Sequence, residues 1–157
     1  VHAAVTQNGC ALYYAANELK ADRDIVHVAV TQNGDALPCA AEEFKADRDI
    51  VYAAVTLNGR LLHYVADELS ADRDIVHAAV TQDGNVFASI NEELRADKNI
   101  ILAALSASNF EDFDSIVMDD LWGDHEITFR LIDLLGDELP LTILFCFVKE
   151  YSNLLVQ

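Results

Sequence analysis

The sequence repeats itself with a period of 25 residues, and this period constrains the fold more than any other feature. When it is written in rows that begin at Val1, Val26, Val51 and Val76, the first two rows are identical at 19 of 25 positions. The shared pattern is D-R-D-I-V-H-A-A-V-T-Q-N-G-x-A-L-x-x-A-A-x-E-L-x-A. Short tandem units cannot bury their apolar faces alone, so they stack on one another. We therefore predict a single repeat array over residues 1–157.

The pattern weakens after residue 100 but does not stop. The segment 101–106 restates residues 1–6, and the acidic stretch 124–127 falls where 22–25 would be after a two-residue insertion. The chain also begins inside a repeat and without Met, so we expect it to come from a longer chain. The predicted units are 1–25, 26–50, 51–75, 76–100, a degenerate 101–127 and a partial 128–157.

Each unit reads as two helices. Asp22 is a suitable N-cap, and Asp24 in the first turn complements the helix dipole. Gly34 ends this helix, and we expect it to supply a left-handed residue. The helical spacing predicts one buried face made of Ile25, Val26, Ala29 and Val30.

The second helix is predicted to run from about Asp35 to Lys45, with Pro38 in its first turn, where a missing N–H has no cost. Its predicted buried stripe at i, i+3, i+4 and i+7 is Leu37, Ala40, Ala41 and Phe44. A strand-plus-helix unit is the alternative, since valines alternate over 26–30 and Asn33-Gly34 is a hairpin signal. Other units carry Ala at the Val28 position, which favours helix. The predicted fold is an all-α solenoid of two-helix repeats.

The chain carries 27 acidic and 10 basic residues, for a formal net charge of −17. Such a surface repels phosphate backbones, so we expect no nucleic-acid partner. Proteins, including ones with basic surfaces, remain possible partners. The longest apolar run, 139–148, is too short to span a bilayer, so we predict that the chain does not cross a membrane.

Three cysteines, Cys10, Cys39 and Cys146, have neither metal-ligand spacing nor an even number for a disulfide framework. We expect reduced thiols and an intracellular location. The compartment stays open, an organelle included, because any targeting segment is out of view.

The units differ mainly at four positions of the second helix, spaced i, i+3, i+4 and i+7, which would share one face. A constant core beside a diversified stripe fits a binding surface, and tyrosine is enriched in interfaces. The alternative is unconstrained drift of solvent-facing residues. The candidate binding residues on this variable face are Tyr13, Tyr14, Asn17, Pro38, Glu42, Arg60, His63, Tyr64 and Asp67.

Other recurring polar residues indicate structural tasks. His2, His27 and His77 occupy one position in three units, with Tyr52 in the unit between the last two, so they are at least a helix spacing from each other, which is too far to share a metal ion. Glu18 and its counterparts Glu43, Glu68 and Glu93 would cap a helix or pair with Arg23, Arg48 or Arg73. No nucleophile elbow, phosphate loop or zinc-protease motif occurs. We therefore predict no catalytic residue, no metal site and no cofactor.

The motif D-R-D-I-V-x-A-A-V-x-Q-N-G-x-A-L-x-Y-A-x-x-E-L resembles the repeats of a family described as domain of unknown function 4116, found mainly in protist and algal proteins. Residues 47–69 are one copy, which departs from the motif at Leu57, Leu61 and Val65. The resemblance covers residues 1–100 well and the rest loosely. It implies a similar unit length but no activity and no site residues.

The C-terminal segment is apolar on too many sides for a solvated end helix. We expect residues 139–156 to be covered by further repeats or by a partner. The candidate contact residues there are Leu144, Phe145, Phe147 and Leu154.

These features favour a non-catalytic protein-interaction scaffold or accessory subunit of a larger intracellular assembly. The alternative is a regulatory or substrate-recruiting repeat region cut from a longer chain that carries an enzyme.

Overall fold

The computed structural model describes residues 1–95 and 97–107, and these residues form helices and turns with no strand among them. The chain divides into two compact units, Val1–Ser108 and Asn109–Gln157, and the described residues belong to the first. The all-α prediction is confirmed for the described residues, and the strand-plus-helix alternative is excluded there. The predicted partial unit 128–157 and most of the degenerate unit 101–127 lie outside them.

Every repeat contributes one α-helix from the first half of the motif. In α3 the Asp22 carboxylate accepts hydrogen bonds from the backbone N–H groups of Asp24 and Ile25, at 3.0 and 3.1 Å. Asp47 and Asp72 cap the following helices in the same way. The predicted N-cap is therefore confirmed. These helices are α1 (His2–Gln7), α3 (Arg23–Gln32), α4 (Arg48–Leu57), α6 (Arg73–Gln82) and α8 (Lys98–Ala107).

The end of each α-helix differs from the prediction. Asn33, not Gly34, is the C-cap of α3, and its backbone is extended at φ −151°. The side chain of Asn33 then accepts a hydrogen bond from the N–H of Asp35 at 3.0 Å and so starts a 3-10 helix. Gly9, Gly34 and Gly59 are all outside the left-handed region. The expectation of a left-handed glycine was wrong, because an Asn cap makes the turn.

The predicted second helix is two short pieces. The 3-10 helices are η1 (Gly9–Tyr14), η2 (Gly34–Cys39), η4 (Gly59–Tyr64) and η5 (Gly84–Ser89). Each is followed by one short turn of helix: α2 (Asn17–Lys20), η3 (Glu42–Ala46), α5 (Asp67–Ser70) or α7 (Glu92–Arg95).

The break between the two pieces falls at an extended dipeptide, Ala40-Ala41. The N–H of Ala41 donates to the carbonyl of Lys20 in the preceding repeat at 3.0 Å, and Ala66 donates to Lys45 likewise at 2.9 Å. In a continuous α-helix, each of these N–H groups would instead donate to the backbone carbonyl four residues earlier in the same repeat. The hydrogen bond to the neighbouring repeat therefore replaces the helical one, and the helix is interrupted here.

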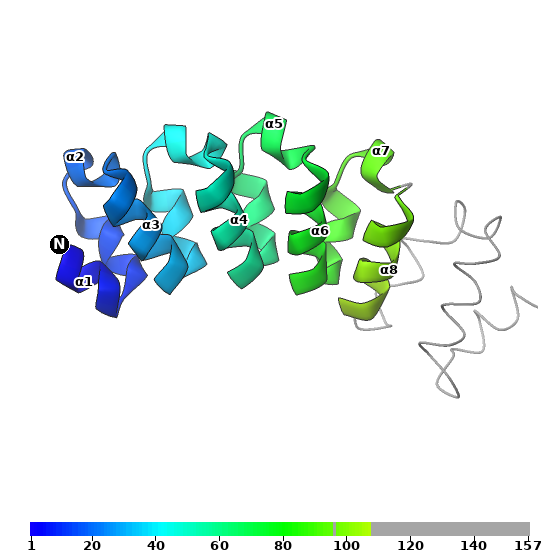
Figure 1. The fold of residues 1–157 in the computed structure, drawn as a ribbon, viewed down its shortest axis with the longest axis horizontal. Helices are drawn as coiled ribbons and strands as arrows, with labels where there is room; N and C mark the ends of the chain where they lie inside the picture. Colours follow the sequence, from blue (N-terminus) through cyan, green and yellow to red (C-terminus); the bar gives the residue numbers. More distant parts are fainter. Residues whose placement is uncertain (96, 108–157) are drawn as a thin grey trace, which may run out of the picture. The chain divides into compact units, whose positions relative to one another are not determined.

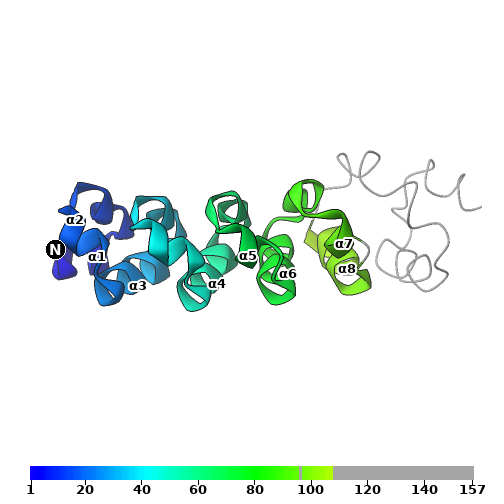
Figure 2. The ribbon, with the colours of Figure 1, turned by 90° about the horizontal axis from the view of Figure 1, so that it is seen from above.

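Successive repeats pack element against equivalent element. α3 contacts α1 and α4, α6 contacts α4 and α8, and the 3-10 helices contact one another in the same order. The α-helices form one row and the 3-10 helices a second row, with the short helices along one edge (Figures 1 and 2). The core lies between the rows and contains Val26, Val30, Leu37, Ile50 and Val55, each 0% exposed.

Candidate interaction surface

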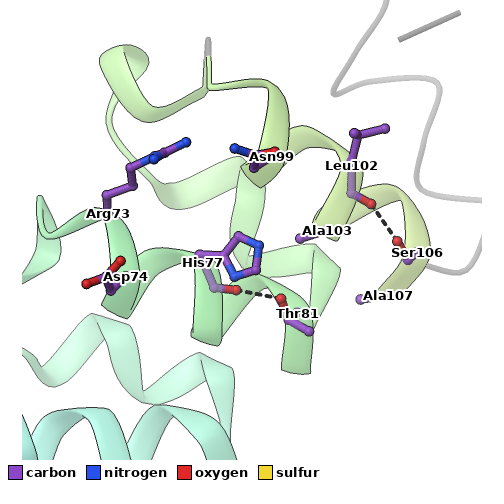
Figure 3. Close-up of a pocket in the computed structure, with 9 residues that line it drawn as sticks. All are labelled: Arg73, Asp74, His77, Thr81, Asn99, Leu102, Ala103, Ser106 and Ala107. Carbon is purple, nitrogen blue, oxygen red and sulfur yellow. Dashed lines mark hydrogen bonds between the residues drawn. The ribbon is translucent and has the colours of Figure 1, made fainter. Parts of the chain in front are cut away.

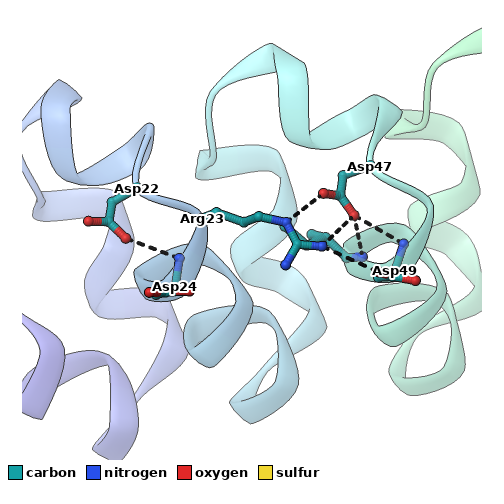
Figure 4. Close-up of polar contacts among 6 residues, drawn as sticks. Asp22, Arg23, Asp24, Asp47 and Asp49 are labelled. Carbon is teal, nitrogen blue, oxygen red and sulfur yellow. Dashed lines mark hydrogen bonds and ion pairs between the residues drawn. The ribbon is translucent and has the colours of Figure 1, made fainter.

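An arginine of one repeat bridges to the helix cap of the next repeat (Figure 4). The Nε of Arg23 lies 2.9 Å from Asp47 Oδ2, and its Nη2 lies 3.3 Å from Asp49 Oδ2. Arg48 makes the same two contacts with Asp72 and Asp74, at 3.2 and 2.7 Å. The D-R-D motif thus supplies the cap, the bridge to the next repeat and a second carboxylate for the preceding arginine.

The bridging carboxylates are held in their ionised form. The hydrogen bond from Arg73 is the main cause that lowers the pKa of Asp97. For Asp72, burial by itself raises the pKa, but the hydrogen bonds from Arg48 and from the Ile75 N–H outweigh burial, so the pKa lies below its usual range. Each junction between repeats therefore carries fixed charges at neutral pH.

The repeated glycine allows close approach between repeats. A Cβ placed on Gly59 would lie 2.2 Å from the carbonyl oxygen of Ala79, and one on Gly34 would lie 2.8 Å from that of Ala54. Real Cβ atoms do not come so near a backbone oxygen, so the spacing depends on glycine. Close backbone approach, rather than turn geometry, explains why glycine recurs.

A glutamine from the next repeat completes this junction. Gln82 Oε1 accepts a hydrogen bond from the N–H of Gly59 at 2.5 Å, and Gln32 Oε1 accepts one from Gly9. Leu57 stands at this position in the repeat between them and has no acceptor, so the N–H of Gly34 lacks the equivalent bond. The junction between the second and third repeats is therefore incomplete.

Two open grooves lie on the row of α-helices. The α4–α6 groove, of about 710 Å³, is lined by Arg48, Asp49, Tyr52, Thr56, Asp74, His77, Ala78, Thr81 and Gln82. The α6–α8 groove, of about 780 Å³, is lined by Arg73, Asp74, His77, Thr81, Asn99, Leu102, Ala103, Ser106 and Ala107 (Figure 3). The two grooves share three residues of α6. The predicted site residues include none of these side chains, although the D-R-D period could have indicated Asp49 and Asp74.

The predicted variable face lies on the other row and its edge. Eight of the nine candidates are exposed, and Pro38 is half-buried. The first three positions of each stripe lie on a 3-10 helix and the fourth, as in Asn17 or Glu42, on the short helix beyond the break. The prediction that the four variable positions share one face of a continuous helix was therefore wrong. His63 and Asp67 still line one small pocket together, between η4 and α5 on one side and residues 89–91 of the next repeat on the other.

The histidines stand apart from one another. His2, His27 and His77 are exposed on α1, α3 and α6, and Tyr52 occupies the same position in α4 with 44% exposure. Within residues 1–95 and 97–107, no three His, Cys, Asp or Glu side chains come together as a metal site would need. Cys10 and Cys39 are free thiols, and burial raises the pKa of Cys39.

The repeated glutamates do not have the predicted partners. Arg23, Arg48 and Arg73 pair with aspartates of the next repeat instead. In the described part of the chain, no hydrogen bond or ion pair holds the exposed side chains of Glu18, Glu43, Glu68 and Glu93. The predicted pairing of these glutamates with arginine was therefore wrong, because the guanidinium groups are paired with the N-cap aspartates of the next repeat.

The remaining candidates, Leu144, Phe145, Phe147 and Leu154, lie outside the described residues. Among the helices that the structure does describe, none is long and apolar enough to cross a bilayer.

Comparison with known families identifies the repeats. The model of the family described as "Domain of unknown function (DUF4116)" matches three times, over residues 1–45, 28–70 and 72–114. Each match is longer than one 25-residue unit and shorter than two, and the first two matches overlap. No curated protein and no solved structure matches the chain. Since the three matches together cover more than half of the chain, it belongs to the DUF4116 family.

Proposed function

We propose that this chain is a non-catalytic protein-interaction scaffold, built as an α-solenoid, whose variable face binds partner proteins. One observation carries the proposal: core positions keep their residue from repeat to repeat, whereas the exposed positions of the variable face change. Val5, Val30, Val55 and Val80 occupy one position in four repeats, and all are 0% exposed. Tyr13, Pro38, His63 and Ala88 occupy another, and none of them is buried.

Exposed tyrosines give this face suitable anchors. Tyr13 and Tyr14 are 64% and 87% exposed, and their rings meet edge to face at a centroid distance of 5.1 Å. The Nζ of Lys20 lies 5.7 Å from the centre of the Tyr13 ring. Tyr64, 51% exposed, offers a third ring two repeats away. Aromatic side chains that are already ordered by neighbours lose little entropy on binding.

The excess of acidic over basic residues favours partners with basic surfaces. The free thiols of Cys10 and Cys39 are compatible with a reducing intracellular compartment, which we propose as the location.

The test compares partner capture by the native chain and by a Tyr13→Ser/Tyr14→Ser/Tyr64→Ser variant, with the bound proteins quantified by mass spectrometry. Each captured protein is then purified and its binding to the native chain and to the variant is measured directly. The matched control is His27→Ser, which removes an exposed ring from the row of α-helices outside both grooves. We expect the triple variant to lose partners that the control retains. Equal capture by all three proteins would contradict binding through the variable face.

A further inference from the structure

We propose that the α4–α6 and α6–α8 grooves together bind one extended segment of a partner protein. This segment carries a basic residue and an apolar residue three positions apart, in either order. The proposal rests on the chain being a protein-binding scaffold, but it uses the row of α-helices rather than the variable face. Figure 3 shows the second of the two grooves.

The α4–α6 groove has an excess of negative charge. Two carboxylates line it, Asp49 and Asp74, with side chains 78% and 74% exposed. The lining guanidinium of Arg48 is already hydrogen-bonded to Asp72 and Asp74. Asp49 has one oxygen in contact with Arg23, at 3.3 Å, and its other oxygen makes no hydrogen bond within the described residues. A cation placed here meets an acceptor that no group of the described residues uses and gains a favourable charge pair.

The same groove presents further acceptors and an aromatic ring. The hydroxyl groups of Thr56 and Thr81 donate to their own helix, at 2.9 Å to the Ala53 carbonyl and 2.7 Å to that of His77. Their hydrogens are thus used, and the oxygen lone pairs are left to accept. Tyr52 is 44% exposed and offers a ring face to a cation. The groove therefore fits the ammonium or guanidinium group of a partner's Lys or Arg.

The α6–α8 groove has different chemistry although it occupies the equivalent place. Asn99 stands where the earlier repeats have Asp49 and Asp74, so α8 supplies no carboxylate to this groove. The Asp74 carboxylate also lines it but is paired with Arg48 at 2.7 Å. Leu102 replaces the histidine or tyrosine, and Ala103 and Ala107 complete an apolar wall. Arg73 is neutralised by Asp97, with 2.6 Å between Nε and Oδ2. This groove fits an uncharged, apolar side chain.

The spacing between the grooves sets the spacing in the ligand. The grooves are one repeat apart, and packed helices lie about 8–10 Å from each other. A segment in the extended polyproline II conformation advances about 3.1 Å per residue and has three residues per turn, so side chains three positions apart lie on the same side, about 9 Å from each other. A basic residue in the α4–α6 groove therefore places the residue three positions away in the α6–α8 groove.

The test is a titration of the ¹⁵N-labelled full chain, followed by amide chemical shifts, with peptides that carry Lys-Ser-Ser-Leu or Leu-Ser-Ser-Lys between Gly-Ser flanks. Comparison peptides carry Lys-Ser-Leu or Glu-Ser-Ser-Leu. We expect at least one of the first two to shift amides of α4, α6 and α8, and both comparison peptides to bind more weakly.

Two matched variants locate the site. Asp49→Asn should weaken binding about tenfold, whereas Asp24→Asn, the same change one repeat earlier and outside both grooves, should change it less than about twofold. Leu102→Asp, which puts a charge into the apolar wall, should weaken the binding of whichever of the first two peptides binds the native chain. The proposal is overturned if no amide shifts, if the spacing has no effect, or if Asp24→Asn and Asp49→Asn weaken binding equally. Because Tyr13, Tyr14 and Tyr64 are untouched, these outcomes are separate from the capture test of the variable face.

Discussion

Arg23 donates to Asp47 in the next repeat through two nitrogens, Nε at 2.9 Å and Nη2 at 3.3 Å, while the same carboxylate caps α4. One side chain thus fixes the start of a helix and its position against the preceding repeat. The arrangement recurs with Arg48 and Asp72 and with Arg73 and Asp97. It explains why both outer residues of D-R-D are acidic in the copies at 47–49 and 72–74.

Asp72 should therefore stabilise the fold in two separable ways, as a helix cap and as a partner of Arg48. Asp72→Ala removes both cap and bridge and should lower the free energy of unfolding by about 0.5–2 kcal/mol. Asp72→Asn keeps a cap acceptor and should cost less. Urea unfolding of the three proteins checks this, and equal losses for the two variants would mean that the cap is unimportant.

The bridges should also make stability depend on pH. The pKa values of Asp47, Asp72 and Asp97 are lowered in the folded chain, so their contribution is complete above the unfolded pKa and is lost as pH falls through the folded value. Most of this loss lies below about pH 4. The net charge of −17 opposes the trend, since protonation elsewhere relieves repulsion. The measurement is therefore the difference in free energy of unfolding between wild type and Asp72→Asn at each pH. Between pH 6 and pH 3, wild type should lose more of its free energy of unfolding than Asp72→Asn does. A constant difference would contradict the bridge.

Gly59→Ala should disturb the junction between the third and fourth repeats. Its Cβ would lie 2.2 Å from the Ala79 carbonyl oxygen, and backbone must move to relieve the clash. We expect a loss of about 1–3 kcal/mol, the usual cost of overpacking. Gly34→Ala, where the corresponding distance is 2.8 Å, should cost less. Thermal unfolding in which Gly34→Ala is the more damaging change would show that the close approach does not set the spacing.

The incomplete junction at Leu57 can be repaired. Leu57 is 48% exposed, so Leu57→Gln sacrifices little burial and supplies the acceptor that Gln82 provides for Gly59. One added hydrogen bond should stabilise the chain by about 0.5–1.5 kcal/mol. The reverse change, Gln82→Leu, should destabilise it by a similar amount. Denaturant midpoints that move in the same direction for both variants would contradict the role given to this position.

The sequence was sufficient for features that depend on local chemistry. Asp22 is recognisable as a cap because its side chain satisfies amides two and three residues ahead, and Ile25, Val26, Ala29 and Val30 are all buried as their helical spacing predicts. The exposure of the variable positions followed from the same periodicity.

Features set by the neighbouring repeat could not be predicted in this way. Leu37, Ala40, Ala41 and Phe44 fit a continuous helix, yet Ala41 donates its N–H to Lys20 of the preceding repeat. Gly34 looked like a helix terminator because its close contact with Ala54 is invisible in a linear sequence. The grooves were missed for the same reason, since Asp49 and Asp74 line one groove only after α4 and α6 pack together.

The most direct test of the central claim, that the variable face binds proteins, is cross-linking in the cells that make this chain. A photoreactive phenylalanine analogue replaces Tyr14, which is 87% exposed on the variable face, or His2, which is exposed on the α-helix of the same repeat. We predict discrete cross-linked proteins from position 14 that disappear when Tyr13 and Tyr64 are changed to Ser. The absence of cross-linked protein at position 14, or the same products from position 2, would contradict the claim.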